Sequence, residues 1–210
     1  MIVRVRLLAR GVVQGVGFRP AVATAARAQG LSGFVRNTRQ GAQIEVQGPA
    51  EKVEEFVRSF RTRLPAAAIL DSLERSSIKP SPIEDGFEIM ESAQDGRNRF
   101  SIPPDLALCP DCEREFLDPT NRRFHYEFIS CGVCGPRYTF MSDMPYDRRN
   151  TTMADFPLCD RCREEYEDPH NRRYHIEGFA CPDCGPRAEG LEKGVAALLA
   201  GWLAAIKGIG

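Results

Sequence analysis

Residues 11–20, GVVQGVGFRP, place three glycines, an arginine and a proline in one short turn between two different patterns. Before the turn, IVRVRLLA (2–9) alternates apolar and charged residues, as a half-buried strand does. After it, PAVATAARAQ (20–29) is rich in alanine and closes at Gly30, which predicts a helix that Pro20 begins. The stretch therefore predicts a strand–turn–helix unit at the start of the chain.

The rest of residues 1–91 predicts one α+β domain. Two alternating runs, LSGFVRNT (31–38) and AQIEVQG (42–48), flank a turn-like RQG and indicate a hairpin. A second helix is indicated by apolar residues at helical spacing, namely Val53, Phe56, Val57, Phe60 and Leu64. Weaker strands follow at 69–75 and 86–91. This order begins with the elements of a ferredoxin-like sandwich, in which both helices cover one face of a small antiparallel sheet.

A cysteine pattern occurs twice after a polar linker at 92–104. Residues 105–139 match residues 155–189, with a connector at 140–154 between them. Each copy has the spacing C-x2-C-x18-C-x2-C, which supplies the four thiolates of a tetrahedral zinc site. The expected ligands of two structural zinc ions are Cys109, Cys112, Cys131, Cys134, Cys159, Cys162, Cys181 and Cys184. The spacing leaves open whether the cysteines pair within each copy or between copies.

Two features of these units have alternative interpretations. His125 and His175 hold the same place in the two copies, so either could ligate zinc, but four cysteines already suffice. We expect each to contact the metal ligands or to pack against other side chains. Basic pairs also recur, at Arg122, Arg123, Arg172 and Arg173. Since the units carry more acidic than basic side chains, we expect these arginines to offset thiolate and carboxylate charge, and no nucleic acid to bind.

Composition excludes several other classes of protein. The formal net charge is −1, the N-terminus lacks the apolar core of a secretory signal, and the longest apolar run, 195–206, is too short to span a bilayer. We therefore expect a cytoplasmic protein without a membrane partner, in which reducing conditions keep the cysteines available for metal.

The glycine turn has the composition of an anion site. Gly15 and Gly17 permit backbone N–H groups to converge near a helix N-terminus, and the Arg19 guanidinium is a planar fork suited to phosphate oxygens. The simpler interpretation is a turn with a surface ion pair, and for Asn37 a turn residue that follows a strand.

Residues 1–91 resemble the acylphosphatases, whose signature is similar to GVVQGVGFRP. Asn37, in GFVRNT, falls where that family has its second catalytic residue. The resemblance implies that Arg19 and Asn37 are catalytic and that Asn37 holds a water in line with phosphorus. It also implies a phosphate-binding set of Gly15, Val16, Gly17, Phe18 and Arg19.

An acylphosphatase-like domain followed by the two cysteine units resembles the N-terminal part of the HypF hydrogenase-maturation carbamoyltransferases, including DPxNRR and CGPR in both units. The resemblance implies carbamoyl phosphate as substrate, and later domains that use ATP to pass a carbamoyl group to a cysteine of a partner protein in [NiFe]-hydrogenase maturation. It also implies that residues 190–210 start a truncated YrdC-like domain. The alternatives are a general acylphosphatase whose zinc units dock a protein, and a scaffold that binds an anion without turnover.

Overall fold

The computed structural model describes residues 1–82, 85–94 and 101–206. Part of the expected linker and the last residues of the expected YrdC-like segment lie outside the described residues. The division of the chain into domains at the boundaries given above stays a prediction.

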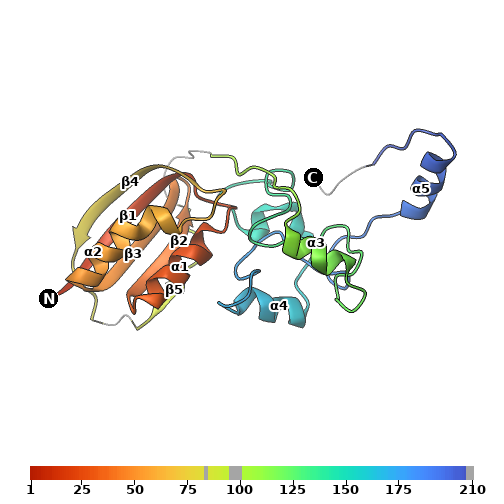
Figure 1. Cartoon of the computed structure of the whole chain (residues 1–210). Helices are drawn as coiled ribbons and strands as arrows, with labels where there is room; N and C mark the ends of the chain where they lie inside the picture. The colour runs from red at the N-terminus through yellow and green to blue at the C-terminus, as the bar shows by residue number, and fades with distance from the viewer. Residues whose placement is uncertain (83–84, 95–100, 207–210) are drawn as a thin grey trace.

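The N-terminal part is a five-stranded sheet with two helices (Figure 1). Its elements are β1 (Ile2–Val12), α1 (Phe18–Ala28), β2 (Ser32–Thr38), β3 (Gly41–Pro49), α2 (Ala50–Ser59), the 3-10 helix η1 (Phe60–Arg63), β4 (Ile69–Ile78) and β5 (Phe87–Ile89). The strand order is β4-β1-β3-β2-β5. The order of elements confirms the predicted α+β sandwich.

One detail of the sheet differs from the expectation. β1, β2, β3 and β4 pair antiparallel, whereas β5 pairs parallel to β2. The difference arises because the chain leaves β4 at one edge of the sheet and returns at the opposite edge, where it runs in the direction of β2. The added strand brings the chain that follows β5 to the end of β2 that carries Asn37, whose carbonyl accepts the Ala93 N–H.

Both helices lie over the same face of the sheet, as predicted (Figure 1). Leu7 of β1 and Ile44 of β3 are opposite each other in register, and both are fully buried beneath the helices. The apolar stripe predicted for the second helix packs on this face, and the Phe60 ring meets Phe18 and Phe56 edge-on, with centroids 5.9 and 5.7 Å apart. These contacts fix α1, and with it the glycine turn, against the sheet.

The start of α1 corrects the sequence-based boundary. The helix begins at Phe18, two residues before Pro20, because Gly17 adopts a left-handed conformation with φ +74° and acts as the N-cap. Pro20 then lies in the first turn, where its missing N–H removes no helical hydrogen bond. Arg19 is therefore a residue of the helix's first turn.

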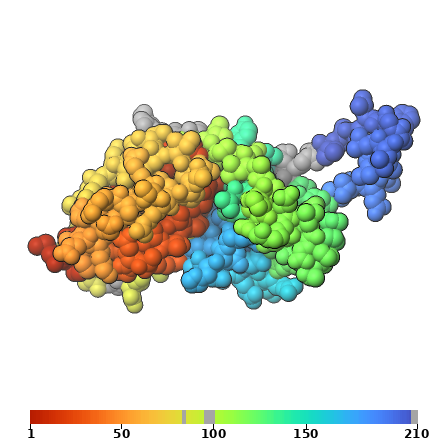
Figure 2. Space-filling view, in the orientation of Figure 1, coloured from red at the N-terminus to blue at the C-terminus, as the bar shows by residue number. Residues whose placement is uncertain are grey.

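The cysteine units pack together and against the open end of the sandwich (Figure 2). The first unit contains α3 (Pro110–Leu117) and the second α4 (Asp160–Glu167). The 3-10 helices η2 (Arg148–Asn150) and η3 (Thr152–Asp155) lie between them, and α5 (Leu191–Leu199) follows the second unit. Helix α5 projects away from the rest of the molecule, with Leu199 85% exposed. Within the described ranges, no helix has both the length and the apolar character needed to span a membrane.

We predict that Leu7→Ala lowers the free energy of unfolding by about 2–5 kcal/mol, because it leaves a cavity beneath both helices. Ile69→Ala is the control, since Ile69 lies in edge strand β4 and is 58% exposed. We expect Ile69→Ala to lower the free energy of unfolding by less than about 1 kcal/mol. Urea denaturation followed by circular dichroism measures both, and equal losses would contradict the assignment of the core.

Candidate active site and metal centres

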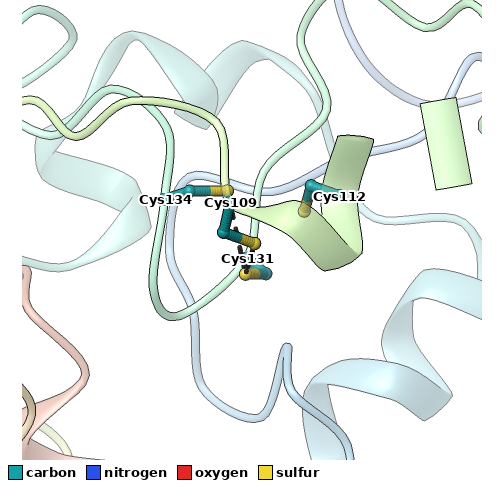
Figure 3. A group of neighbouring side chains, drawn as sticks. All are labelled: Cys109, Cys112, Cys131 and Cys134. Atoms are coloured by element: carbon teal, nitrogen blue, oxygen red, sulfur yellow. Dashed lines mark hydrogen bonds between the residues drawn. The ribbon is translucent and has the colours of Figure 1, made fainter. Parts of the chain in front are cut away.

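Each cysteine unit brings its own four thiols together. Figure 3 shows Cys109 and Cys112 at the start of α3, facing Cys131 and Cys134. The four Sγ atoms of each unit lie within 4.8 Å of one another, and the Cys131 and Cys134 sulfurs are 3.8 Å apart. Four thiolates at a Zn–S distance of about 2.3 Å have sulfurs about 3.8 Å apart in a tetrahedron. The residues therefore fit one zinc ion per unit, with pairing inside each unit.

Local backbone geometry places these thiols. Cys109 is the N-cap of α3 and Pro110 its first residue, so Cys112 is held on the first turn beside Cys109. On the opposite loop, Gly135 has φ +94°, which lets the chain turn back directly after Cys134. The Val133 N–H donates to the Cys131 sulfur at 3.4 Å. These features place the four thiols beside one another.

The two equivalent histidines lie outside both thiol clusters. His125 stacks on Phe124 with ring centroids 3.8 Å apart, and His175 contacts the rings of Tyr166 and Tyr174. Both have positive φ, +52° and +49°, in the left-handed region that His tolerates better than most residues. Both histidines therefore pack against aromatic rings.

Arginines cross between the units to the opposite thiols. Arg122 of the first unit donates to Cys162 Sγ at 2.5 Å, and Arg172 of the second unit donates to Cys112 Sγ at 2.9 Å. Burial opposes the charged form of Arg172, but the Cys131 and Cys112 sulfurs outweigh it and raise its pKa. Arg122 and Arg172 therefore offset thiolate charge, as expected, and each does so for the cysteines of the opposite unit.

Arg123 and Arg173, the next residues along the chain, likewise bond to the opposite unit, but to carboxylates. Arg123 Nη2 donates to Glu165 Oε2 at 2.6 Å, and Arg173 Nη2 donates to Glu115 Oε2 at 2.5 Å. Both arginine side chains are almost fully buried. The pairing links each unit to the other through the same DPxNRR segment.

The glycine turn presents unpaired backbone donors. Gly15 and Gly17 have φ of +70° and +74°, and a Cβ at Gly15 would lie 3.1 Å from the Tyr146 ring. Within the described part of the chain, the N–H groups of residues 15–19 make no hydrogen bond. Converging N–H groups at a helix N-terminus form an anion-binding nest.

Arg19 lies beside this nest and is held by acceptors from outside the sandwich. Its Nη1 donates to Asp147 Oδ1 at 2.9 Å, and its Nη2 donates to Glu177 Oε1 at 2.7 Å and to the Tyr146 carbonyl at 3.1 Å. The arginine is 8% exposed. Burial disfavours its charge, but Glu177 and Asp147 outweigh burial and raise its pKa. Five guanidinium donors less these three leave Nε and one Nη1 proton for a ligand.

Asn37 reaches the same carbonyl. It is fully buried at the end of β2, and its Nδ2 donates to the Tyr146 carbonyl at 3.1 Å. This bond fixes the orientation of the amide, and Oδ1 has no hydrogen-bond partner among the described residues. The structure therefore brings Arg19 and Asn37 together, as the resemblance implied, through a backbone atom of the connector.

A second cavity adjoins Arg19. It has a volume of about 280 Å³, and Glu91, Ser92, Asp147, Arg149, Tyr166, His175 and Glu177 are among the residues that line it. Glu177 and His175 also line the smaller cavity that contains Gly15, Gly17 and Phe18. Sequence reasoning missed Tyr146, Asp147 and Glu177, because they lie in the connector and second unit, where the cysteines were the only chemical signal.

The chain matches two known families. Residues 5–89 match the Acylphosphatase family model, and residues 108–141 and 158–189 match the HypF finger model. An acylphosphatase from Caldivirga maquilingensis is 46% identical over 74 residues, covering 34% of this chain and 77% of the relative. The fold and the matched segments therefore define an acylphosphatase domain followed by two zinc fingers.

Longer proteins contain the same combination. Carbamoyltransferase HypF2 of Cupriavidus necator is 46% identical over 153 residues, covering 72% of this chain and 19% of the relative. A crystal structure of full-length HypF in the phosphate- and nucleotide-bound form matches with a TM-score of 0.92 and 39% identity, over 100% of this chain and 29% of that chain. HypF carbamoyltransferases are therefore homologues of this chain, and the chain spans about a fifth of the length of these curated relatives.

The crossed arginines predict site-specific changes in zinc affinity. Arg172→Met should weaken zinc at the first unit about 10–100-fold, and Arg122→Met at the second, because each removes a hydrogen bond to a ligand sulfur. Chelator competition measures affinity, and ¹¹³Cd NMR of the substituted protein identifies the perturbed site. Arg114→Met is the control on α3, because Arg114 pairs with Asp111 at the surface. Weakening of the arginine's own unit instead would contradict the crossed assignment.

The partly buried imidazole of His175 predicts part of the acid sensitivity of the fold. Burial, with Arg19 and Arg27 nearby, lowers the pKa of His175 from 6.5 to about 4. Between pH 6.5 and about pH 4, His175 binds a proton in the unfolded chain but not in the folded chain. The free energy of unfolding therefore falls as the pH falls from 6.5 to about 4. His175→Asn, which suits the left-handed backbone, should reduce the loss measured between pH 7 and pH 5.5. Zinc content is checked at each pH, and an unchanged loss would refute the prediction.

Proposed function

We propose that this chain binds carbamoyl phosphate at the glycine turn and hydrolyses it to carbamate and phosphate. The observation that carries this proposal is the set of unpaired N–H groups at residues 15–19, beside Arg19 and the amide of Asn37. Three elements meet there: the turn after β1, the first turn of α1 and the end of β2. Such a site offers hydrogen bonds and positive charge to a phosphoryl group from the chain's own residues.

The reaction needs positioning more than bond-making by the protein. The N–H groups and the two remaining Arg19 protons would hold the phosphoryl oxygens, where they stabilise charge in a loose transition state. Asn37 Oδ1 would accept a hydrogen bond from water and hold it for attack on phosphorus. The water oxygen bonds to phosphorus, the bond to the bridging oxygen breaks, and carbamate leaves. The proton of the water passes to a phosphate oxygen.

Zinc would contribute to this reaction only through structure. Cys109, Cys112, Cys131 and Cys134 would hold one ion and the second four cysteines the other, with every tetrahedral position filled by sulfur. The metal supplies cross-links that stabilise the fold of each unit. The connector and second unit then supply the Tyr146 carbonyl, Asp147 and Glu177 to the Arg19 site.

The wider role follows from the relatives. We propose that this chain's part of a carbamoyltransferase feeds later domains, which use ATP and pass the carbamoyl group to a cysteine of a partner protein for [NiFe]-hydrogenase maturation. This rests on the carbamoyltransferases it resembles, and with it we propose a YrdC-like domain beginning at 190–210 and a cytoplasmic location. The eight free thiols suit a reducing compartment.

Phosphate release from carbamoyl phosphate tests the reaction. Arg19→Ala should lower kcat/KM at least about 100-fold, since it removes preorganised charge, and Asn37→Ala should lower kcat by a similar factor. Arg36→Ala is the matched control, because Arg36 adjoins Asn37 on β2 but bonds to Gln43. Circular dichroism and zinc content verify folding. A folded wild type without activity, or an active Arg19→Ala variant, would refute the proposed site.

A further inference from the structure

Two carboxylates beside the phosphate-binding arginine pose an electrostatic problem. Asp147 and Glu177 both bond to Arg19, and their side chains are only 16% and 5% exposed. A phosphoryl group bound at the same guanidinium would be repelled by both, since charges in a buried site are weakly screened. Pairing stabilises the buried guanidinium, but it also leaves two carboxylates beside the site, whose oxygens can accept hydrogen bonds from other groups.

Glu177 is the carboxylate that borders both cavities beside Arg19. It lines the smaller cavity, together with Gly15, Gly17 and Phe18, and also the larger cavity, whereas Asp147 lines only the larger of these two. Because an acyl group is bonded directly to a phosphoryl oxygen, an acyl phosphate held by the turn places that group near Arg19. The carboxylate that shares this guanidinium borders the same cavity as the glycine turn.

The contacts of Glu177 hold it in place and leave one acceptor position open. Oε1 accepts from Arg19 Nη2, Oε2 accepts from the Arg148 N–H at 3.2 Å, and the Tyr166 hydroxyl lies 3.3 Å from both oxygens. A carboxylate has about four lone-pair positions, and these donors occupy three. The group is therefore a preorganised acceptor with unused capacity.

We infer that Glu177 is a specificity-determining residue that accepts a hydrogen bond from the carbamoyl amide of the substrate. This inference rests on the proposed function and assigns the selectivity of that same site. The carbamoyl group carries N–H donors where an acetyl group carries a methyl. A buried acceptor discriminates strongly between two such isosteres, because the methyl leaves it unpaired.

The first unit contains a natural control for this residue. Glu127 occupies the same place in the repeat as Glu177, because each lies two residues after the histidine of its unit, His125 or His175. Glu127 is exposed, whereas Glu177 is buried and paired with Arg19. Replacement of Glu127 therefore reports any general effect of removing a carboxylate from a finger.

Binding of two phosphonates tests the inference without turnover. Phosphonoacetamide and acetonylphosphonate differ only in an amide NH₂ against a methyl, and calorimetry gives Kd for each with the zinc-loaded full chain. Wild type should prefer phosphonoacetamide at least about 10-fold, as expected for a hydrogen bond to a charged group. Glu177→Met, which lacks acceptor oxygens, should bring the ratio close to one, and Glu127→Met should leave it unchanged.

Glu177→Gln covers the case in which the Met variant does not fold. Its neutral amide should lower the ratio at least about threefold, because an uncharged acceptor forms the weaker hydrogen bond. Equal Kd values in wild type, or an unchanged ratio in the folded variants, would overturn the inference. Hydrolysis of carbamoyl and acetyl phosphate is measured in parallel. Absence of hydrolysis with a clear binding preference would refute the proposed reaction alone, whereas hydrolysis without preference would refute the role of Glu177 alone.

Discussion

The buried charge of Arg19 is the constraint on which the arrangement of this molecule depends. A guanidinium cannot lose its proton in a protein, so it must be paired when it is removed from water. The sandwich supplies none of its side-chain hydrogen-bond acceptors among the described residues; they come from Tyr146, Asp147 and Glu177. Removing one partner of a buried ion pair costs about 3–5 kcal/mol. Because the partners of Arg19 lie in the connector and the second unit, the docking of these segments stabilises the Arg19 charge. The glycine turn is thus next to an arginine that the connector and the second unit hold in place.

A similar exchange of charge makes the two fingers one structure. A zinc ion with four thiolates has a net charge of about −2, and each thiol set receives an arginine from the opposite unit. The adjoining Arg123 and Arg173 bond to Glu165 and Glu115 across the same boundary. Neither finger balances its own charge, so the two stabilise each other. This pairing in turn fixes the second finger, which carries Glu177.

The positioning of Asn37 and Arg19 by one carbonyl has a chemical consequence. The Tyr146 oxygen accepts from both side chains and therefore fixes their mutual orientation. The Gln14 side chain accepts the Tyr146 N–H at 2.8 Å and donates to the Thr38 carbonyl, which ties the connector to the ends of β1 and β2. Hydrogen-bond donors that are already oriented, as those of Arg19 and Asn37 are, stabilise a developing charge without reorganisation. The connector is therefore part of the site.

The sequence alone determined the sandwich, the glycine turn and the two thiol sets, because alternation, helical spacing, glycine conformation and C-x-x-C turns are local properties of the chain. Arg19 and Asn37 were identifiable because a local motif carries them. Only the tertiary structure decided the parallel pairing of β5, the crossing of Arg122 and Arg172, and the docking at Arg19. A backbone carbonyl has no sequence signature, and Glu177 shares its place in the repeat with Glu127 but differs from it in burial. Burial and partner choice depend on how distant segments pack, so no local pattern encodes them.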